Sequence, residues 1–542
     1  MALSLAATAE AQVGGRVGLI RDHLPPGGSL LGSLGVDVDG AGDVNGDGFD
    51  DIIAACYGLD AAVVYSGKDG STLHWFTRVG SSSVYGSEVA GVGDINGDGF
   101  ADVAVGDRGD ARVYLHSGMD GSLLHTLSGP PVYSDFGCSI AGLEDVTGDG
   151  IPDILVGARS TSVPPHNFCG SAFVFSGASG TQVLRVDGDI SYASFGRHVN
   201  DAGDVNGDGT PDFLVVASRD TQPLGTLGAT IVYSGVDGSQ LLRATGENGQ
   251  SGIWMRADGI GDVDGDGLDD IAVGDHSTGL PWDRRGVVTV YSGASGLALW
   301  EWAGVGDQKI GMDVAGTGDI NGDGIPDLLV GIQGDYGGSL SRPRRSAMLV
   351  AGHNGKFLAR LSDSDGDSSI RFGEAVAAVG DINGDGRTEF AVGDDEHGIS
   401  KGRVLVFGFN PQMTASTTEV SASLGGTVDL NIDFPQVDAG QSYAVLASRR
   451  GTGPFQGAGI RIPLTPDQVF RNAAGGQYPF ANHTGMHGLL DPDGDATAQI
   501  VFQPLEVPGW MVGKTFYLAA VTADASGVSE KSSIVVGIRF LP

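Results

Sequence analysis

The sequence predicts an all-β fold: a seven-bladed β-propeller followed by a smaller β-sandwich-like domain. Three observations lead to this prediction. One Asp- and Gly-rich pattern recurs seven times, each copy is flanked by strand-like segments, and glycine makes up 92 of the 542 residues, enough for many tight turns. A chain of this length exceeds what one compact core can hold, so more than one domain is expected.

The repeated pattern is nine residues long and reads D-x-N-G-D-G-x-x-D in its commonest form. Its copies begin 51 to 62 residues apart, which is close to the length of one propeller blade. The first residues of the seven copies are Asp43, Asp94, Asp145, Asp204, Asp262, Asp319 and Asp381. Seven copies in register cannot arise by chance.

Four strand signals accompany each copy except the last. An apolar residue and a glycine precede the pattern, as at Phe136-Gly137, although the fifth copy has Ile253-Trp254 instead. An apolar run follows it, such as DIAVG at 270–274, and then two apolar runs flank a turn such as SGKDG at 66–70. A single four-stranded sheet cannot bury both of its faces, whereas seven sheets stacked radially bury them and close a ring.

The last copy lacks one strand. Its third strand, Arg403–Phe407, is followed by Asn410-Pro411 and by no SG turn. The segment Gly15–Asp22 precedes the first blade and has no partner of its own, so we expect it to supply the missing outer strand. The propeller is therefore predicted to span residues 13–410, with residues 15–22 closing the last blade.

Residues 411–542 contain no further copy of the pattern. Strand-like runs, among them Thr427–Asp433 and Thr515–Thr522, alternate with Gly-, Pro- and Asp-rich turns, and helical periodicity is absent. This length and number of strands predict a β-sandwich-like domain. The sequence assigns it no chemistry.

The apolar-Gly element, the D-x-N-G-D-G-x-x-D loop and the closing Val-Gly together resemble FG-GAP repeats, over residues 30–410. These repeats occur in the seven-bladed propeller of integrin alpha chains and in many secreted bacterial proteins. The resemblance is specific for the fold and for a bound metal, and it says little about a ligand.

The loop residues themselves point to a metal. Positions 1, 3, 5 and 9 carry side-chain oxygen, position 6 is always glycine, and the variable position 7 suits a backbone carbonyl ligand. A hard cation needs about six or seven such oxygens, and Ca²⁺ fits a flexible loop better than Mg²⁺. The loop is not an EF-hand, because Ala54 stands where position 12 would need Glu. We expect about seven Ca²⁺ ions, with ligands Asp43, Asn45, Asp47, Phe49, Asp51, Asp94, Asn96, Asp98, Phe100, Asp102, Asp145, Thr147, Asp149, Ile151, Asp153, Asp204, Asn206, Asp208, Thr210, Asp212, Asp262, Asp264, Asp266, Leu268, Asp270, Asp319, Asn321, Asp323, Ile325, Asp327, Asp381, Asn383, Asp385, Arg387 and Glu389.

The loops differ in charge. Loop 5 has four carboxylates and is expected to bind most tightly, whereas loop 3 has Thr147 in place of Asn and is expected to bind most weakly. The alternative is a set of Asx-rich turns that bind no metal. Turns do not need three or four converging carboxylates, whose repulsion would destabilise an empty loop.

Loop length divides the predicted ring into two faces. The metal loops and SG turns are short and uniform, whereas the loops at the opposite end are long and variable, as at Ala158–Gly170. Variable loops more often carry recognition. Seven basic and aromatic residues of blades 5 and 6 are the candidate site for an anionic glycan or protein: Trp282, Arg284, Arg285, Tyr336, Arg342, Arg344 and Arg345. The alternative is that these arginines only offset nearby acidic residues.

Charge and the N-terminal segment bear on location. The formal net charge of −36 disfavours nucleic acid and suits a protein that collects cations. No apolar run is long enough to span a membrane. Residues 1–12 are apolar and contain the small-x-small site Ala7-Thr8-Ala9, as in the remnant of a secretory signal, although a frayed N-terminus reads the same way. Only three cysteines are present, so at most one disulfide can form, with Cys138 and Cys169 the nearer pair, and three free thiols are the alternative.

Together these features favour a secreted or cell-surface calcium-binding module that binds glycan or protein ligands. A structural protein that self-assembles into a surface layer or fibre, and a polysaccharide-acting hydrolase or lyase, are the alternatives. No HExxH or G-x-S-x-G motif is present, so no catalytic residue is assigned.

Overall fold

The computed structural model describes most of the propeller and the strands of the C-terminal domain. The described residues are 15–25, 32–78, 84–130, 133–221, 228–245, 255–278, 285–305, 308–321, 324–335, 344–361, 371–384, 387–395, 402–411, 413–415, 419–421, 423, 426–433, 442–448, 455–457, 460–462, 482–484, 486–489, 495–502, 512, 515–523, 529–532 and 536–541. The predicted signal remnant at residues 1–12 lies outside them.

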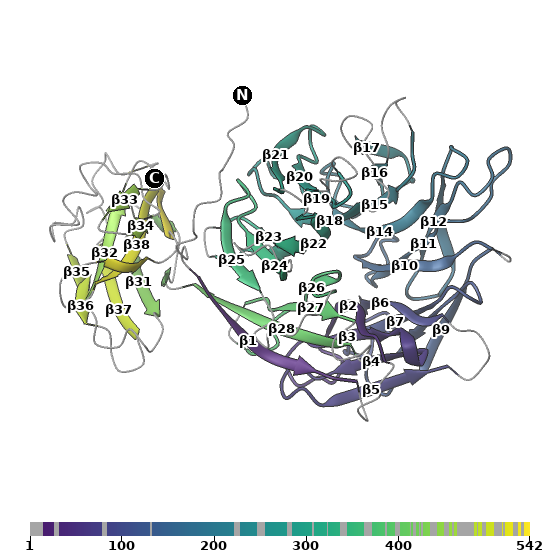
Figure 1. Cartoon of the computed structure of the whole chain (residues 1–542), viewed down its shortest axis with the longest axis horizontal. Helices are drawn as coiled ribbons and strands as arrows, with labels where there is room; N and C mark the ends of the chain where they lie inside the picture. The colour runs from purple at the N-terminus through teal and green to yellow at the C-terminus, as the bar shows by residue number, and fades with distance from the viewer. Residues whose placement is uncertain are drawn as a thin grey trace.

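Seven four-stranded antiparallel sheets form a ring, which confirms the predicted propeller (Figure 1). Blade 1 has β2 (Leu34–Gly42), β3 (Asp51–Cys56), β4 (Ala61–Tyr65) and β5 (Thr72–Thr77), with a short η2 (Tyr57–Leu59) between β3 and β4. Blade 2 has β6 (Tyr85–Gly93), β7 (Asp102–Asp107), β8 (Arg112–His116) and β9 (Leu123–Ser128). Blade 3 has β10 (Phe136–Leu143), β11 (Asp153–Ala158), β12 (Ser171–Phe175) and β13 (Gln182–Asp187).

The remaining blades repeat this order from the axis outward. Blade 4 has β14 (Phe195–Gly203), β15 (Asp212–Ala217), β16 (Ala229–Tyr233) and β17 (Gln240–Thr245). Blade 5 has β18 (Met255–Gly261), β19 (Asp270–Asp275), β20 (Val287–Tyr291) and β21 (Ala298–Ala303). Blade 6 has β22 (Ile310–Gly318), β23 (Asp327–Asp335), β24 (Arg344–Val350) and β25 (Phe357–Leu361). Blade 7 has β26 (Val376–Ala378), β27 (Phe390–Asp394), β28 (Arg403–Pro411) and, as its outer strand, β1 (Gly15–His23).

Burial follows the position of a strand within its blade. The second strands of blades 1 to 5 are buried at every residue, whereas an outer strand such as β13 is exposed at most of its residues. The apolar core lies between neighbouring blades, where Ile53 and Val64 of blade 1 pack with Val89 and Val105 of blade 2. Because each face of a blade is covered by the next blade, the apolar second strands are buried on both sides.

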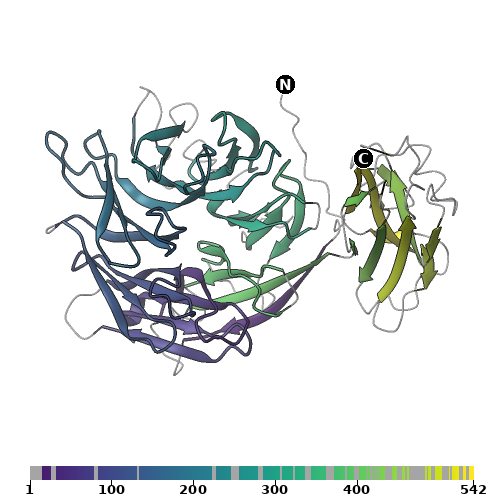
Figure 2. The same cartoon turned by 180° about the vertical axis from the view of Figure 1, so that it is seen from behind.

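Blade 7 joins segments from both ends of the propeller. β1 pairs antiparallel with β28 from Gly15 opposite Pro411 to His23 opposite Val404, with a bulge between Leu19 and Arg21. In both views β1 lies along the outer edge of blade 7 beside β28 (Figures 1 and 2). The ring is therefore closed by one long-range strand pair.

Neighbouring blades are also joined at their SG turns. His74 of blade 1 hydrogen-bonds through Nε2 to the carbonyl of Gly118 in blade 2, and Trp300 of blade 5 donates from Nε1 to the carbonyl of Gly352 in blade 6. Arg21 of β1 makes the corresponding contact with blade 1, donating to the carbonyl of Lys68 (2.6 Å). β1 thus completes both blade 7 and the seam between blades 7 and 1.

The C-terminal domain is made of strands only, among the residues that the structure describes. One sheet has the order β29-β31-β37-β35, a second has the order β30-β40-β38-β32-β36 with β39 beside β38, and β33 and β34 form a hairpin. The strands are β29 (Met413–Ala415), β30 (Glu419–Ser421), β31 (Gly426–Asp433), β32 (Ser442–Ser448), β33 (Phe455–Gly457), β34 (Ile460–Ile462), β35 (Asn482–Thr484), β36 (His487–Leu489), β37 (Asp495–Phe502), β38 (Thr515–Ala523), β39 (Ser529–Ser532) and β40 (Val536–Leu541). Two such sheets agree with the predicted sandwich-like fold.

Two further observations concern the whole chain. Cys56, Cys138 and Cys169 are all free and buried, which settles the alternative left open by the sequence in favour of thiols. Within the described ranges, no helix has the length and apolar character required to cross a bilayer.

Candidate metal centres

Each Asp-rich loop connects the innermost strand of a blade to the second strand. In blade 1 it runs from the end of β2 to the start of β3, and Gly46 and Gly48 adopt φ values of +72° and +85°. Residues with a side chain rarely adopt such values, so the two glycines allow the chain to turn tightly around the loop centre. In blades 1 to 6 a hydrogen bond from the SG turn to the ninth loop residue places the loop and the turn at the same end of the blade.

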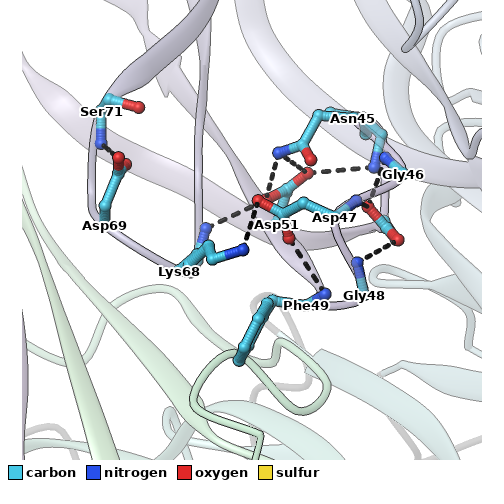
Figure 3. Close-up of polar contacts among 12 residues, drawn as sticks. Asn45, Gly46, Asp47, Gly48, Phe49, Asp51, Lys68, Asp69 and Ser71 are labelled. Carbon is cyan, nitrogen blue, oxygen red and sulfur yellow. Dashed lines mark hydrogen bonds and ion pairs between the residues drawn. The ribbon is translucent and has the colours of Figure 1, made fainter.

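The first aspartate of the loop is held by backbone amides. Asp43 accepts hydrogen bonds from the N–H groups of Gly46 (2.7 Å), Asp47 (3.1 Å) and Gly48 (2.9 Å). Figure 3 labels these three donor residues in loop 1. The equivalent aspartates of loops 2 to 5 accept the same three bonds; they are Asp94, Asp145, Asp204 and Asp262. The carboxylate is thereby fixed facing the interior of the loop.

The ninth residue ties the loop to the SG turn. Asp51 is fully buried and accepts bonds from Val44 N–H (3.0 Å) and from Gly67 N–H of the SG turn (3.0 Å). The same bond from an SG-turn glycine to the ninth carboxylate recurs in blades 2 to 6, in the pairs Gly118–Asp102, Gly177–Asp153, Gly235–Asp212, Gly293–Asp270 and Gly352–Asp327. This role was not predicted from the sequence, although the turn glycine recurs in six blades and follows a serine in five of them, with Ala351 in place of the serine in blade 6.

Burial raises the pKa of these ninth carboxyl groups. The pKa of Asp51 rises to about 7, and the negative charges of Asp43 and Asp47 add to the effect of burial. The pKa of Asp212 likewise rises to about 7, and those of Asp102 and Asp270 rise to about 6. A divalent cation between these groups would stabilise their charged form.

Loop 5 brings its donors closest together. The donor oxygens of Asp262, Asp264 and Asp270 lie within 4.8 Å of one another, and no other such group of acidic, His or Cys side chains occurs among the described residues. Asp266 is not part of this group. Three carboxylates at this separation, one buried and two more exposed, fit the oxygen-donor set that a hard cation requires.

The other loops differ in detail. In loop 3 the Thr147 hydroxyl donates to Asp145 (3.4 Å), whereas in loop 1 the amide nitrogen of Asn45 lies 3.3 Å from Asp51 Oδ2. Glu389, the ninth residue of loop 7, is buried and accepts bonds from Ile382 N–H and from Asn383. Two predicted ligands, Asp323 and Asp385, lie outside the described residues. In loops 1 to 5 the expected ligands at positions 1, 3, 5 and 7 lie in the turn, whereas the ninth residue is the first residue of the second strand of the blade.

Loop 1 has a basic neighbour. Lys68 stands in the variable position of the SG turn, with its Nζ 3.9 Å from Asp47 Oδ2 and 4.8 Å from the centre of the Phe49 ring (Figure 3). The other turns carry Met119, Ala178, Val236, Ala294 and His353 at this position. A positive charge beside a candidate metal ligand lowers the negative potential of the loop.

Three of the predicted anionic-ligand residues lie within the described part of the chain. Arg285 is exposed, and its carbonyl accepts a bond from Ile310 N–H (3.1 Å). Arg344 and Arg345 lie at the start of β24, but their side chains are outside the described part. The other four residues, Trp282, Arg284, Tyr336 and Arg342, also lie outside it.

An exposed aromatic pair stands on the variable face between blades 3 and 4. Phe168 and Tyr192 are 43% and 59% exposed, their rings stack at 5.8 Å, and both residues adopt positive φ values of 50° and 66°. Their loops are held together, because Tyr192 N–H donates to Asn167 (3.0 Å) and Phe168 N–H donates to the Ser162 hydroxyl (2.8 Å). Bulky side chains in this strained backbone region are unusual and tend to occur at functional sites. The sequence analysis did not single them out.

The innermost strands line an axial cavity of about 910 Å³. Its carboxylates accept bonds from backbone amides of the next blade, which would otherwise be unpaired at the inner sheet edge. The bonds run from Val89 to Asp37 (2.8 Å), from Gly91 to Asp39 (3.1 Å), from Gly316 to Asp258 (2.8 Å) and from Val376 to Asp313 (3.0 Å). These hydrogen bonds therefore link each of the carboxylates to the neighbouring blade. Burial raises the pKa values of Asp39 and Asp313 to about 6.

Comparisons with known proteins agree with this architecture. The model of the FG-GAP-like repeat matches residues 43–105 and 94–156, and the model of the FG-GAP repeat matches residues 372–407. Integrin alpha-V of Gallus gallus is 30% identical over 202 residues, which is 32% of this chain and 19% of that protein. Integrin alpha-3 of Cricetulus griseus is 33% identical over 22% of this chain and 14% of that protein, and integrin alpha-6 of Homo sapiens is 34% identical over 27% and 14%.

The matched region is therefore less than one fifth of the length of each of these relatives. Among solved structures, hydrazine synthase of Kuenenia stuttgartiensis superposes with a TM-score of 0.43 at 12% identity, over 66% of this chain and 92% of that chain. A likeness this weak is no evidence of a shared activity.

Proposed function

We propose that this chain, whose FG-GAP repeats build a seven-bladed propeller like that of its integrin alpha relatives, is a calcium-binding module that recognises a glycan or protein ligand outside the cell. The observation that carries the proposal is the recurrence of one donor arrangement. In blades 1 to 6 a buried ninth carboxylate is bonded to the SG turn, in loops 1 to 5 backbone amides hold the first carboxylate, and in loop 5 the donor oxygens of three carboxylates converge within 4.8 Å. Turns that bind no metal have no need of this convergence.

Calcium is the cation that best suits these loops. The donors are carboxylate, amide and backbone oxygens on a flexible turn, and Ca²⁺ accepts six to eight oxygens at irregular angles whereas Mg²⁺ requires a near-ideal octahedron. The side chains at positions 1, 3, 5 and 9 and the carbonyl at position 7 would hold the ion. Extracellular modules bind Ca²⁺ at roughly 10⁻⁴–10⁻³ M, a concentration that occurs outside cells. This range supports secretion or display at the cell surface.

Metal analysis of the purified protein tests this part of the proposal. After dialysis against millimolar Ca²⁺ we expect about seven ions per chain, and a melting temperature that falls when EDTA is added. Asp270→Ala should remove the ion of loop 5, whereas Asp237→Ala, in the SG turn of blade 4, should leave the stoichiometry unchanged. A calcium-treated protein that holds no metal would refute the assignment.

The variable face is where we place the ligand. The Phe168–Tyr192 pair offers a flat, exposed aromatic surface on well-anchored loops, and such surfaces stack on sugar rings or on peptide side chains. The expectation of an anionic ligand comes from the arginines of blades 5 and 6, among which Arg285 is exposed. A partner with both an apolar ring face and an acidic group, such as an acidic polysaccharide, would suit the two features.

A binding screen on immobilised glycans and on cell surfaces, with Ca²⁺ present, tests the ligand. We expect the double variant Phe168→Ala, Tyr192→Ala to bind at least ten times more weakly than the wild type. Leu297→Ala removes a side chain of similar exposure (69%) from an SG turn at the opposite end of the ring and is the matched control. Equal loss in both variants, or no loss in either, would contradict this placement.

The two alternatives give different results in simple assays. A self-assembling structural protein would elute as a large species in size-exclusion chromatography with Ca²⁺ and as a monomer with EDTA. A polysaccharide-acting hydrolase or lyase would release reducing ends or unsaturated products from its substrate.

A further inference from the structure

Adjacent metal loops touch one another through positions 7 and 8. In loop 5 these positions are Leu268 and Asp269, neither of which is expected to supply a side-chain ligand. Asp269 N–H donates to the carbonyl of Asp204, the first residue of loop 4 (3.2 Å), and Asp269 Oδ2 accepts from the N–H of Asp204 (2.8 Å). The backbone of the first ligand residue in loop 4 is therefore held on both sides by a residue of loop 5.

The same connection occurs at two other seams. Asp50 of loop 1 donates to the carbonyl of Asp381 in loop 7 (3.2 Å) and accepts from its N–H (2.8 Å). Ala101 of loop 2 donates to the carbonyl of Asp43 in loop 1 (3.1 Å), with no carboxylate to return the bond. Position 8 thus binds the preceding loop at the 7–1, 1–2 and 4–5 seams.

The side chain at position 7 provides a second, independent contact at the same three seams. It lies over the first glycine of the preceding loop, so closely that a Cβ on that glycine would clash. A Cβ on Gly46 would be 2.5 Å from Phe100, one on Gly384 would be 2.8 Å from Phe49, and one on Gly207 would be 2.9 Å from Leu268.

Three other seams lack both the hydrogen bond from position 8 and the cover by the side chain at position 7. Position 8 is proline in loops 3, 4 and 6, and proline has no N–H to donate; the residues are Pro152, Pro211 and Pro326. The glycines that would be covered at these seams, Gly97, Gly148 and Gly265, have no atom within 4 Å of a built Cβ. The seam between loops 6 and 7 borders residues outside the described part of the chain.

We propose that Asp50 and Asp269 are positioning residues that couple cation binding between neighbouring loops, so that loops 7, 1 and 2 form one cooperative group, loops 4 and 5 form another, and loop 3 binds on its own. This inference rests on the proposed calcium binding. Binding at loop 5 orders positions 7 and 8 of that loop, and these positions hold Asp204 in the geometry that loop 4 needs. The second ion therefore binds a loop whose first ligand is already fixed, and such coupling typically changes affinity about 5- to 150-fold.

Counting bound ions at limiting Ca²⁺ by native mass spectrometry tests the grouping. The variants Asp266→Ala and Asp149→Ala remove the exposed fifth residue of loop 5 and of loop 3, respectively. At the Ca²⁺ concentration that half-saturates the wild type, we expect Asp266→Ala to lower the number of bound ions by more than one, because loops 4 and 5 both lose occupancy, and Asp149→Ala to lower it by at most one. Both variants lose one carboxylate of equal position, so long-range charge effects are matched.

A second set of variants tests Asp269 itself, with Tb³⁺ luminescence and hydrogen exchange at the Asp204 amide as readouts. Asp269→Ala should weaken the tightest ions about fivefold or more and speed exchange at Asp204. Asp269→Asn retains an oxygen acceptor without the charge and should behave like the wild type. Asp237→Ala removes a nearby charge but no seam contact and should also leave both readouts unchanged.

The outcomes separate this inference from the proposed function. If the wild type binds no Ca²⁺, both are overturned. If the wild type binds about seven ions but Asp266→Ala loses only one and Asp269→Ala behaves like the wild type, the coupling is overturned and the calcium sites stand. If Asp269→Asn and Asp237→Ala weaken binding as much as Asp269→Ala does, charge rather than the seam bond is responsible, and the role of Asp269 is overturned.

Discussion

Replacing an SG-turn glycine with alanine tests the link between turn and metal loop at a single atom. A Cβ added to Gly118 would lie 1.8 Å from the carbonyl oxygen of Ala101 and 2.7 Å from Cβ of Val44. The first neighbour is a backbone atom of metal loop 2 and the second belongs to a fully buried side chain, so the turn itself has to move by more than 1 Å. That movement breaks the bond from Gly118 N–H to Asp102 (2.9 Å) and the contact of its carbonyl with His74.

The expected decrease in the free energy of unfolding follows from the two lost contacts and the overpacking. A hydrogen bond to a buried charged group contributes about 1.5–3 kcal/mol and a neutral one about 0.5–1.5 kcal/mol. Overpacking a tight interior adds about 1–3 kcal/mol. We expect Gly118→Ala to lower the free energy of unfolding by about 3–5 kcal/mol and to weaken the ion of loop 2, because the ninth ligand of that loop loses its anchor.

Urea unfolding at saturating Ca²⁺, followed by fluorescence, measures the first effect, and metal analysis at limiting Ca²⁺ measures the second. Met119→Ala is the matched control, since Met119 is the next residue in the same turn and its side chain is 59% exposed. An unfolding free energy of Gly118→Ala within about 0.5 kcal/mol of the wild type would refute the argument that the turn anchors the loop.

Three further predictions follow from other contacts. Lys68→Ala should raise the affinity of loop 1 for Ca²⁺ a few-fold because it removes a positive charge 3.9 Å from Asp47, and Lys68→Arg should not, as a Ca²⁺ titration would reveal. Deleting residues 12–24 should lower the melting temperature sharply because β1 completes blade 7, and unchanged melting would contradict closure by this strand. The contribution of Asp39 and Asp313 to stability should fall as the pH rises from about 4 to about 7, because the pKa values of both groups are raised in the folded protein to about 6 and the stabilisation by their protonated forms is lost on passing those values. Asp39→Asn keeps an acceptor and should make that decline shallower in denaturation curves recorded across this pH range; an identical slope would count against the assignment.

The fold could be predicted because its information is local and repeated. Each Asp-rich loop predicts a turn between two strands. Its seven copies predict seven blades, and this prediction needs no knowledge of the contacts between blades. The expectation of an all-β ring with a β-rich C-terminal domain is confirmed by the sheets of the structure. The pairing of β1 with β28 joins Gly15 to Pro411, and only the absence of a fourth strand in the last repeat indicated it.

The candidate site could be predicted only in part. The identity of the loop residues points to oxygen donors, but the bond from Gly67 to Asp51 joins residues of different turns and is visible only in three dimensions. Phe168 and Tyr192 are isolated aromatics in the sequence, and nothing local shows that their loops lie together or that their φ values are positive. The arginine patch of blades 5 and 6 stays a prediction, because most of its residues lie outside the described part of the chain.

The position of β1 also determines how the ring would respond to tension. Gly15 lies opposite Pro411, so the two chain segments that enter and leave the propeller do so at the same point of blade 7. A pulling force applied across these two segments would separate the strand pair from one end, so that its hydrogen bonds break one after another. The other six blades would bear little of that force. Blade 7 would therefore yield first under mechanical load and leave the remaining disc intact.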